Sequence, residues 1–403
     1  MKIAIWLDSE YRPEEGGGFS YYDKLVRAID AYCFSSELDV CFVSNGDITA
    51  LPLKREKYQL CYKSNLTFVE KVKAHMPLYK DYYKPILQNQ KNLEKNRSYI
   101  EQLQSLGIEV IYYLRQSECL VPNFPFVATN WDIGHSSTYA FPELVMDEEF
   151  ERRSHFYTNI LPKALFVFAE SESGKQELIR YTNIADFKIK VVPIFAGNCI
   201  NEIASKEEQM AVLRRYGLKD NRYFFYPAQF WAHKNHVNLI KAFKSFLHRN
   251  PDFKLVLTGS NKGNFAYIQE LVKRLNVTEQ IVFAGFVDNA VINTFFLNAT
   301  ALCMASFFGP TNMPPIEAMS IGCPVICSDL AGHREILGDA ALYFDAHDVS
   351  AIAECMERIL NRRDEYVTKI TKQAIQSKFT IDEAMKRINT YMLELVAIRS
   401  AWN

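Results

Sequence analysis

The stretch from Ala305 to Asp339, ASFFGPTNMPPIEAMSIGCPVICSDLAGHREILGD, combines a loop, a helix, a strand and a second loop. Thr311 or Asn312 can cap a helix start, and the Pro-Pro pair that follows suits a first turn, where a missing N–H costs nothing. Gly322 stands where a C′ glycine ends a helix. The short apolar run CPVIC that comes next predicts a buried strand. The stretch is therefore typical of an α/β sheet protein.

The start of this helix predicts an anion site. Free backbone N–H groups at a helix N-terminus carry roughly half a positive charge, which suits a phosphate. Glu317 lies one turn further along, and its carboxylate can accept two hydroxyl hydrogen bonds. A diphosphate that joins a sugar to a ribose would satisfy both features.

Length and composition limit the remaining alternatives. A chain of 403 residues exceeds what one core usually covers, so we expect two domains. A net charge of -1 gives no field that would attract nucleic acid. The nine cysteines form no Cys-x-x-Cys pair and predict reduced thiols rather than a zinc site. No apolar run approaches the length of a spanning helix, so we expect a cytoplasmic protein that is at most peripheral to a membrane.

A glycine-rich loop follows the first predicted strand, Lys2 to Leu7. It consists of Gly16, Gly17 and Gly18, and it precedes a helical pattern. Only glycine lets backbone N–H groups approach a ligand so closely, so the loop predicts a ligand contact. It lacks the Gly-x-Gly-x-x-Gly dinucleotide fingerprint, which disfavours a Rossmann dehydrogenase.

Residues 60–105 form a predicted helical insertion. Between Lys71 and Arg97 there are seven Lys/Arg and two Asp/Glu. Two interpretations stay open. The segment is a solvated helical insertion, or it is a basic, tyrosine-rich surface that meets a membrane face or a lipid-linked acceptor.

Two polar segments follow predicted strands of the first half. Asp132 and His135 lie just beyond one strand, and the loop from Glu170 to Gly174 lies beyond another. Ligand sites in open α/β sheets gather at such strand ends. A histidine there can take or hold a proton near neutral pH, or it simply bonds a neighbouring backbone group.

The second half begins near residue 200 with a new series of strands. Lys234 follows the first of them at the start of a helix, where it can neutralise a phosphate. His233 and His236 flank it, but no carboxylate near them in sequence completes a metal ligand set. Gly259 ends the next strand.

Two halves of alternating strands and helices, each with ligand loops at strand ends, describe two Rossmann-like domains that face each other across a cleft. The second half resembles glycosyltransferase family 4, a group of retaining sugar transferases with the GT-B fold. The family pattern is Glu-x7-Glu-Ala-Met-x-x-Gly-x-Pro-Val, and Glu317 to Val325 matches its second part. The glycine loop, the Asp132–His135 turn, Lys234 and Gly259 also match.

Two positions depart from the family pattern. Gly309 stands where the family has the first glutamate, which helps to hold the donor sugar. Gln229 stands where the family usually has an arginine, five residues before the lysine. The variant Phe-Gly-Pro-Thr-Asn, residues 308–312, resembles a branch found among bacterial O-antigen and capsule transferases.

The resemblance implies a role for each matched residue. It assigns the catalytic positions to His135, Lys234 and Glu317, with His135 near the donor sugar and acceptor. The donor diphosphate and sugar would contact Gly16, Gly17, Gly18, Gln229, Lys234, Gly309, Pro310, Thr311, Asn312 and Met313. The nucleoside would contact Gly259, Phe286, Val287 and Glu317, with the ribose on Glu317.

The implied protein is an enzyme, a retaining hexosyltransferase that needs no metal or other cofactor, because the chain has no Asp-x-Asp. Its donor would be a nucleotide sugar (GDP-mannose, or a UDP- or dTDP-sugar), and its acceptor a glycan or lipid-linked oligosaccharide in bacterial O-antigen or capsule synthesis. The alternatives are a sugar-nucleotide epimerase or hydrolase of the same fold, or a catalytically silent nucleotide-sugar-binding protein. The expected domains are 1–200 on the acceptor side, 201–380 for the nucleotide sugar, and a helix at 381–403 that crosses back to the first domain.

Overall fold

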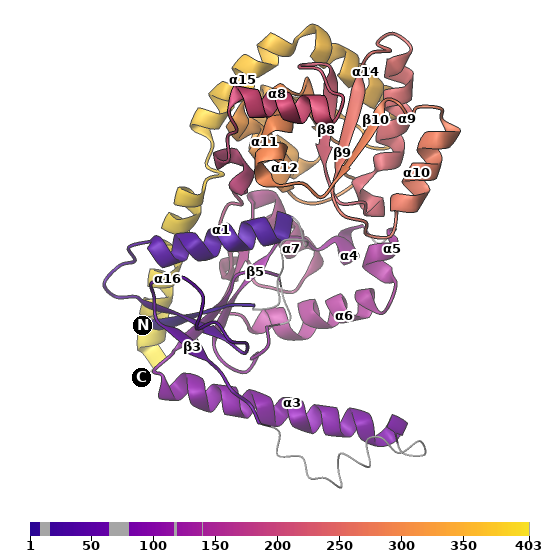
Figure 1. Ribbon diagram of the computed structural model, residues 1–403. Helices are drawn as coiled ribbons and strands as arrows, with labels where there is room; N and C mark the ends of the chain where they lie inside the picture. The colour runs from indigo at the N-terminus through magenta and orange to yellow at the C-terminus, as the bar shows by residue number, and fades with distance from the viewer. Residues whose placement is uncertain (9–16, 64–79, 117–118, 139, 403) are drawn as a thin grey trace.

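The computed structural model describes residues 1–8, 17–63, 80–116, 119–138 and 140–402. The chain forms two α/β domains, drawn one above the other in Figure 1, and each is built on a parallel sheet. Helices cover the sheets, so the strands are buried and read as nearly continuous apolar runs. The predicted pair of Rossmann-like domains is confirmed.

The first sheet has seven parallel strands in the order β3-β2-β1-β4-β5-β6-β7. The register places Ala4 of β1 beside Cys41 of β2 and Ile111 of β4. The strands are β1 (Lys2–Trp6), β2 (Asp39–Ser44), β3 (Lys57–Gln59), β4 (Val110–Tyr113), β5 (Phe126–Asn130), β6 (Phe166–Ala169) and β7 (Ile189–Val191). The carboxyl ends of β5 and β6 carry the polar turns that begin at Asp132 and Glu170.

The helices of the first domain differ greatly in length. The longest is α3 (Lys80–Ser105), which lies along the bottom of Figure 1 and belongs to the predicted insertion. Its Tyr99 lies 6.4 Å from the Trp6 ring, so its C-terminal part packs on the core. Residues 64–79 of the insertion lie outside the described residues, and the two interpretations of its surface stay predictions. The other helices are α1 (Gly17–Ala31), α4 (Gly134–Ser137), α5 (Pro142–Val145), α6 (Glu149–His155) and α7 (Glu172–Tyr181).

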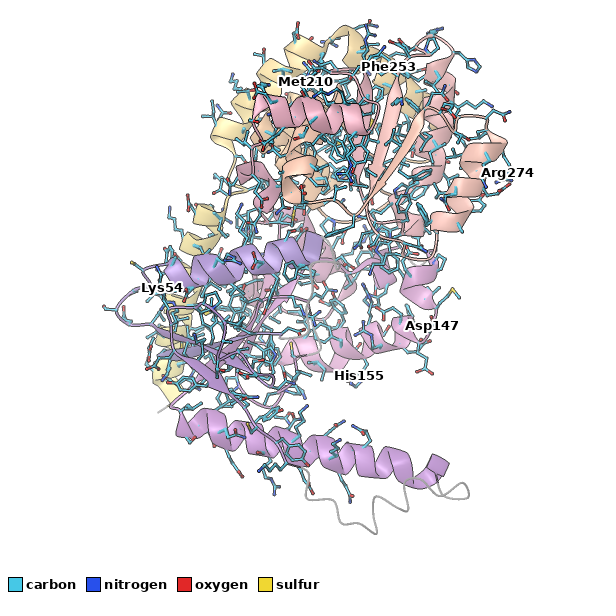
Figure 2. All side chains as sticks on the ribbon, in the orientation of Figure 1. Lys54, Asp147, His155, Met210, Phe253 and Arg274 are labelled. Carbon is cyan, nitrogen blue, oxygen red and sulfur yellow. The ribbon has the colours of Figure 1, made fainter. Side chains whose placement is uncertain are left out.

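The second sheet has six parallel strands in the order β10-β9-β8-β11-β12-β13. These are β8 (Tyr223–Pro227), β9 (Lys254–Thr258), β10 (Ile281–Gly285), β11 (Ala301–Met304), β12 (Val325–Ser328) and β13 (Ala341–Phe344). The helices around it are α8 (Lys206–Arg215), α9 (His236–Leu247), α10 (Phe265–Arg274), α11 (Asn289–Asn298), α12 (Met313–Ile321), α13 (Ala331–Leu337), α14 (Val349–Asn361) and α15 (Arg363–Gln376). Figure 2 shows side chains throughout both domains, with Phe253 in the upper domain and His155 in the lower.

The chain passes between the domains twice. The first passage follows β7, and the second lies between α15 and α16 (Ile381–Arg399). Helix α16 is separate from α15, because the Thr380 side chain accepts from Glu383 N (3.2 Å) and starts a new helix. Helix α16 then returns along the lower domain in Figure 1. Its Glu394 forms an ion pair with Lys190 at 2.8 Å.

Two further points concern the whole chain. The boundaries at residues 200 and 380 stay predictions, although the two sheets lie on either side of residue 200. None of the helices in the described ranges is long and apolar enough to cross a lipid bilayer.

Candidate functional site

Two adjoining cavities lie between the domains. The first, of about 320 Å³, is lined from the first domain by Gly17, Gly18, Tyr21, Asp132 and Glu170, and from the second by Gln229, Lys234, Gly309, Pro310, Asn312 and Met313. The second, of about 450 Å³, is lined by Gly259, Phe286, Val287 and Glu317 among others. Gly17, Gln229 and Met313 border both cavities. The site is therefore elongated, with α12 beginning where the two cavities meet.

The start of α12 differs from the prediction in one respect. Neither Thr311 nor Asn312 caps the helix with its side chain. The Thr311 hydroxyl instead donates to Glu170 Oε2 across the cleft, and Asn312 Oδ1 accepts from Lys234. Of the first four N–H positions, two are prolines, so Asn312 and Met313 alone can donate backbone N–H groups from this end. The helix dipole remains, but the direct donors are few.

Lys234 is positioned by the turn between β8 and α9. Asn235 has φ of 57°, and its amide donates to Ala305 O (3.1 Å) and Ala346 O (2.8 Å), which ties the turn to the core. Tyr226 Oη donates to Lys234 O (2.7 Å). The ammonium of Lys234 donates to Asn312 Oδ1 at 2.7 Å. Burial lowers the pKa of Lys234 to about 8, although the nearby carboxylates oppose the change. Lys234 is thus a desolvated cation that faces the first cavity.

A contact between the domains holds the residue before it. His233 Nδ1 lies 2.5 Å from Glu143 Oε1, and His233 N donates to the same oxygen at 2.9 Å. This carboxylate is not near His233 in sequence, because Glu143 lies 90 residues away on α5 of the other domain. Across the described ranges, however, no group of three or more His, Cys, Asp or Glu could hold a metal ion. The pair links the turn that carries Lys234 to the first domain.

The second cavity contains all four residues predicted to contact a nucleoside. Glu317 is buried, and its Oε1 accepts from Gly197 N at 3.2 Å. Burial raises the pKa of Glu317, while bonds from the Cys199 thiol and the Gly197 N–H oppose this. At Gly259, φ is +126° and a Cβ would lie 2.6 Å from Ala228 O, so this strand end requires glycine. The second cavity therefore holds both the Glu317 carboxylate and the glycine turn at Gly259, where a ligand can come close to the backbone.

His135 lies behind the lining of the first cavity. Its ring packs against that of Tyr157, tilted by 33° with 4.9 Å between centroids, and Nε2 lies 3.1 Å from Ser136 Oγ. Its Nδ1 has no hydrogen-bond partner in the described part of the chain. Burial lowers the pKa of His135 to about 4, so the ring is neutral at pH 7. The histidine that does line the cavity is His233.

The remaining predicted residues divide into two groups. Gly17, Gly18, Gln229, Gly309, Pro310, Asn312 and Met313 line the first cavity, whereas Thr311 is fully buried below it. Gly16 lies outside the described residues. The individual roles of all these residues stay predictions.

Sequence reasoning gave no role to Glu170, which lines the first cavity. Its carboxyl accepts from Thr311 Oγ1 and from Ser171 Oγ (3.3 Å). Burial raises the pKa of Glu170 to about 8, so it is largely protonated at pH 7. The sequence feature that could have indicated Glu170 is its position at the end of a predicted strand. Its partner Thr311 lies 141 residues away, so no local pattern joins the two.

Comparisons with known proteins agree with this geometry. Residues 207–377 match the family described as Glycosyl transferases group 1. The chain is 27% identical over 196 residues to O-antigen chain mannosyltransferase B of Escherichia coli, covering 48% of this chain and 51% of that protein. It is 26% identical over 240 residues to the uncharacterized glycosyltransferase MJ1607 of Methanocaldococcus jannaschii, covering 57% and 60%. The alignments thus span about half to three-fifths of these relatives.

Solved structures extend the likeness to the whole fold. The chain superposes on Anabaena Alr3699/HepE, solved with UDP and glucose, with a TM-score of 0.68, 16% identity and coverage of 98% and 99%. It superposes on WaaG, a glycosyltransferase involved in lipopolysaccharide biosynthesis, with a TM-score of 0.66, 13% identity and coverage of 95% and 98%. The chain has the GT-B architecture of these structures, and the family match lies within its second domain.

Proposed function

We propose that the protein transfers a hexosyl unit from a nucleotide sugar to a glycan or lipid-linked acceptor, with retention of configuration and without a metal ion. The arrangement of the two adjoining cavities carries the proposal. Glu317 lies in the cavity that suits a nucleoside, and Lys234 lies in the cavity that suits a diphosphate and sugar. The start of α12 lies between them, where a diphosphate would bridge the two.

Leaving-group stabilisation is the chemistry that this site supports best. Departure of the nucleoside diphosphate develops negative charge, and a fixed cation in a water-poor cavity stabilises it. Gln229 supplies no charge at the usual arginine position, and α12 offers two backbone donors, so most of this task would rest on Lys234. Glu170 in its protonated form adds no negative charge beside the phosphates.

Retention follows in this proposal from attack on the same face that the diphosphate leaves. The departing phosphate oxygen would receive the proton of the acceptor hydroxyl, so no carboxylate nucleophile is needed. His135 would position or polarise the reacting groups from behind the lining. Its burial among Tyr157 and Phe150 favours an orienting role over proton transfer, because the ring stays neutral across the physiological range.

The acceptor and the biological setting rest on the relatives. O-antigen chain mannosyltransferases and a lipopolysaccharide glycosyltransferase are among the similar proteins. We therefore propose a role in bacterial surface polysaccharide synthesis, with the enzyme acting in the cytoplasm or at the inner face of the membrane. A mannosyl donor such as GDP-mannose is the first candidate, and UDP- and dTDP-sugars are the others.

A panel of nucleotide sugars in a thermal-shift assay tests the donor. The nucleotide sugar that binds the native state should raise Tm as its concentration exceeds Kd. Lys234→Ala and Glu317→Ala should each abolish most turnover, whereas Lys241→Ala, an exposed lysine on α9, should not. Transfer at the wild-type rate by both site variants would refute the assignment.

Product analysis separates the remaining alternatives. NMR of the product should show the same anomeric configuration as the donor and a new glycosidic bond. A free sugar would indicate a hydrolase, and an isomerised nucleotide sugar an epimerase. Binding of the donor with no turnover on any acceptor would indicate a silent binding protein. Full activity in excess EDTA is expected, and loss of activity that Mg²⁺ restores would refute metal independence.

A further inference from the structure

A chain of hydrogen bonds leads from the backbone after β12 to Lys234. His333 Nδ1 lies 2.8 Å from Ser328 O. His333 Nε2 lies 3.1 Å from Asn312 Nδ2, and Asn312 Oδ1 accepts from Lys234 Nζ at 2.7 Å. His333 and Ser328 are fully buried, and Asn312 borders the first cavity. The chain therefore connects the interior of the second domain to the proposed donor site.

The direction of each hydrogen bond follows from its ends. A backbone carbonyl can only accept, so His333 carries its proton on Nδ1. A neutral imidazole has one N–H, so Nε2 accepts from the Asn312 amide. At the other end an ammonium can only donate, which also requires Asn312 Oδ1 to face Lys234. Both ends thus demand the same orientation of the amide. Burial lowers the pKa of His333 to about 4, which agrees with a neutral ring.

Besides Lys234 and His333, the carbonyl of Gly309 also favours this orientation of the Asn312 amide. Its second amide hydrogen is directed at Gly309 O (3.3 Å), a contact weaker than the one to His333. Its backbone has φ of 60°, so the residue is held in a conformation that few side chains adopt. A flipped amide would turn its NH2 group toward the ammonium of Lys234 and leave His333 facing an oxygen.

We propose that His333 is a positioning residue, which holds the Asn312 amide with Oδ1 toward the donor cavity and thereby places the Lys234 ammonium for the diphosphate. The proposal rests on the proposed function for its ligand. The position of the Lys234 ammonium can be measured without any ligand, so the role of His333 and the proposed function can be tested separately.

Two substitutions separate the two hydrogen bonds of the His333 ring, the one to Ser328 O and the one to Asn312. His333→Gln places a carbonyl oxygen near the position of Nε2, so it can still accept from Asn312. His333→Asn keeps an amide that can donate to Ser328 O but ends too short to reach Asn312. A role in packing alone would be disturbed by both variants. A positioning role would be lost only in His333→Asn.

The first measurement needs no nucleotide. The pH dependence of Lys234 acylation, followed by peptide mass spectrometry, reports the pKa of its ammonium. His333→Asn should lower the midpoint by about one pH unit, because an acceptor for the charged form is lost, and His333→Gln should leave it unchanged. Asp132, Glu143, His233 and His236, the other titratable groups that act on Lys234 or its turn, are present in every variant. An unchanged midpoint in folded His333→Asn would overturn the proposal.

The second measurement uses nucleoside diphosphates and monophosphates in calorimetry. His333→Asn should bind the diphosphate roughly tenfold more weakly and bind the monophosphate nearly as well as the wild type. In an Asn312→Ala background the same substitution should have no further effect. Equal losses in both His333 variants, or additive losses in the double variant, would overturn the proposal. If the wild type binds no nucleotide, the proposed function fails, and acylation still decides the role of His333.

Discussion

Replacing Glu170 by glutamine removes a carboxyl that is buried between the domains and keeps an oxygen that can accept from Thr311. Burial raises the pKa of Glu170 from 4.5 to about 8. A carboxyl with a raised folded-state pKa stabilises the native state fully below its unfolded pKa, and this contribution is lost as the pH rises toward the folded pKa. At 1.36 kcal/mol per pKa unit, wild-type stability should fall by about 3 kcal/mol between pH 5 and pH 8 relative to Glu170→Gln.

Calorimetry over this pH range measures the effect. For domains of this size 1 kcal/mol corresponds to about 2–4 °C in Tm, so the Tm difference between the two proteins should change by roughly 6–12 °C. Other groups titrate equally in both proteins and cancel in the difference. Glu354→Gln, at an exposed position on α14, serves as the control and should give a curve parallel to the wild type. If the curve of Glu170→Gln is also parallel, Glu170 is ionised in the native protein and the reasoning is refuted.

Three further predictions follow from the same region. The affinity for a nucleoside diphosphate, measured by calorimetry, should fall about tenfold between pH 7.5 and pH 9, because Lys234, with its pKa lowered to about 8, loses its charge. The affinity of Lys234→Arg should not change over this range, because arginine stays charged. Gly134→Ala should lower the free energy of unfolding by about 1–3 kcal/mol, because the new Cβ would lie 2.7 Å from Phe308 Cε2. Adding Phe308→Leu should recover part of the lost Tm, and no recovery would contradict the contact. Gly332→Ala should cost about 3 kcal/mol or more and abolish nucleotide binding, because its Cβ would lie 1.2 Å from Pro310 O; normal binding in titration calorimetry would exclude this account.

Local signals allowed the fold around the opening stretch to be predicted correctly. The Pro-Pro pair and Gly322 delimit α12, and Gly322 does adopt φ of 80° at its end. The apolar run after it became β12. These features depend on residues within a few positions of one another, and backbone sterics and burial decide them. The same holds for the alternation of buried strands and helices in both domains.

The contacts across the cleft could not be predicted in this way. Glu143 lies 90 residues from His233, and Glu170 lies 141 residues from Thr311. No local pattern pairs them, because the pairing depends on how two folded domains meet. The capping prediction failed because Thr311 donates to Glu170 of the first domain, whereas Asn312 bonds Lys234 and His333 of its own domain. Local patterns named Lys234 and the start of α12, which the structure brings together, but not the residues of the first domain that contact this region.

The two passages between the domains run side by side. Arg387 of α16 donates to Val191 O (3.2 Å) at the end of β7, and one shared cavity borders both Pro193 and Ser377. Because the two connections lie at the same side, a hinge rotation of the domains about that side would leave them in place. The contacts of Glu143 with His233 and of Phe141 with Phe307 lie between the domains away from these connections, so such a rotation would break them. Under the proposed function, such a rotation during donor entry would break the His233–Glu143 contact, and closure would restore it beside Lys234.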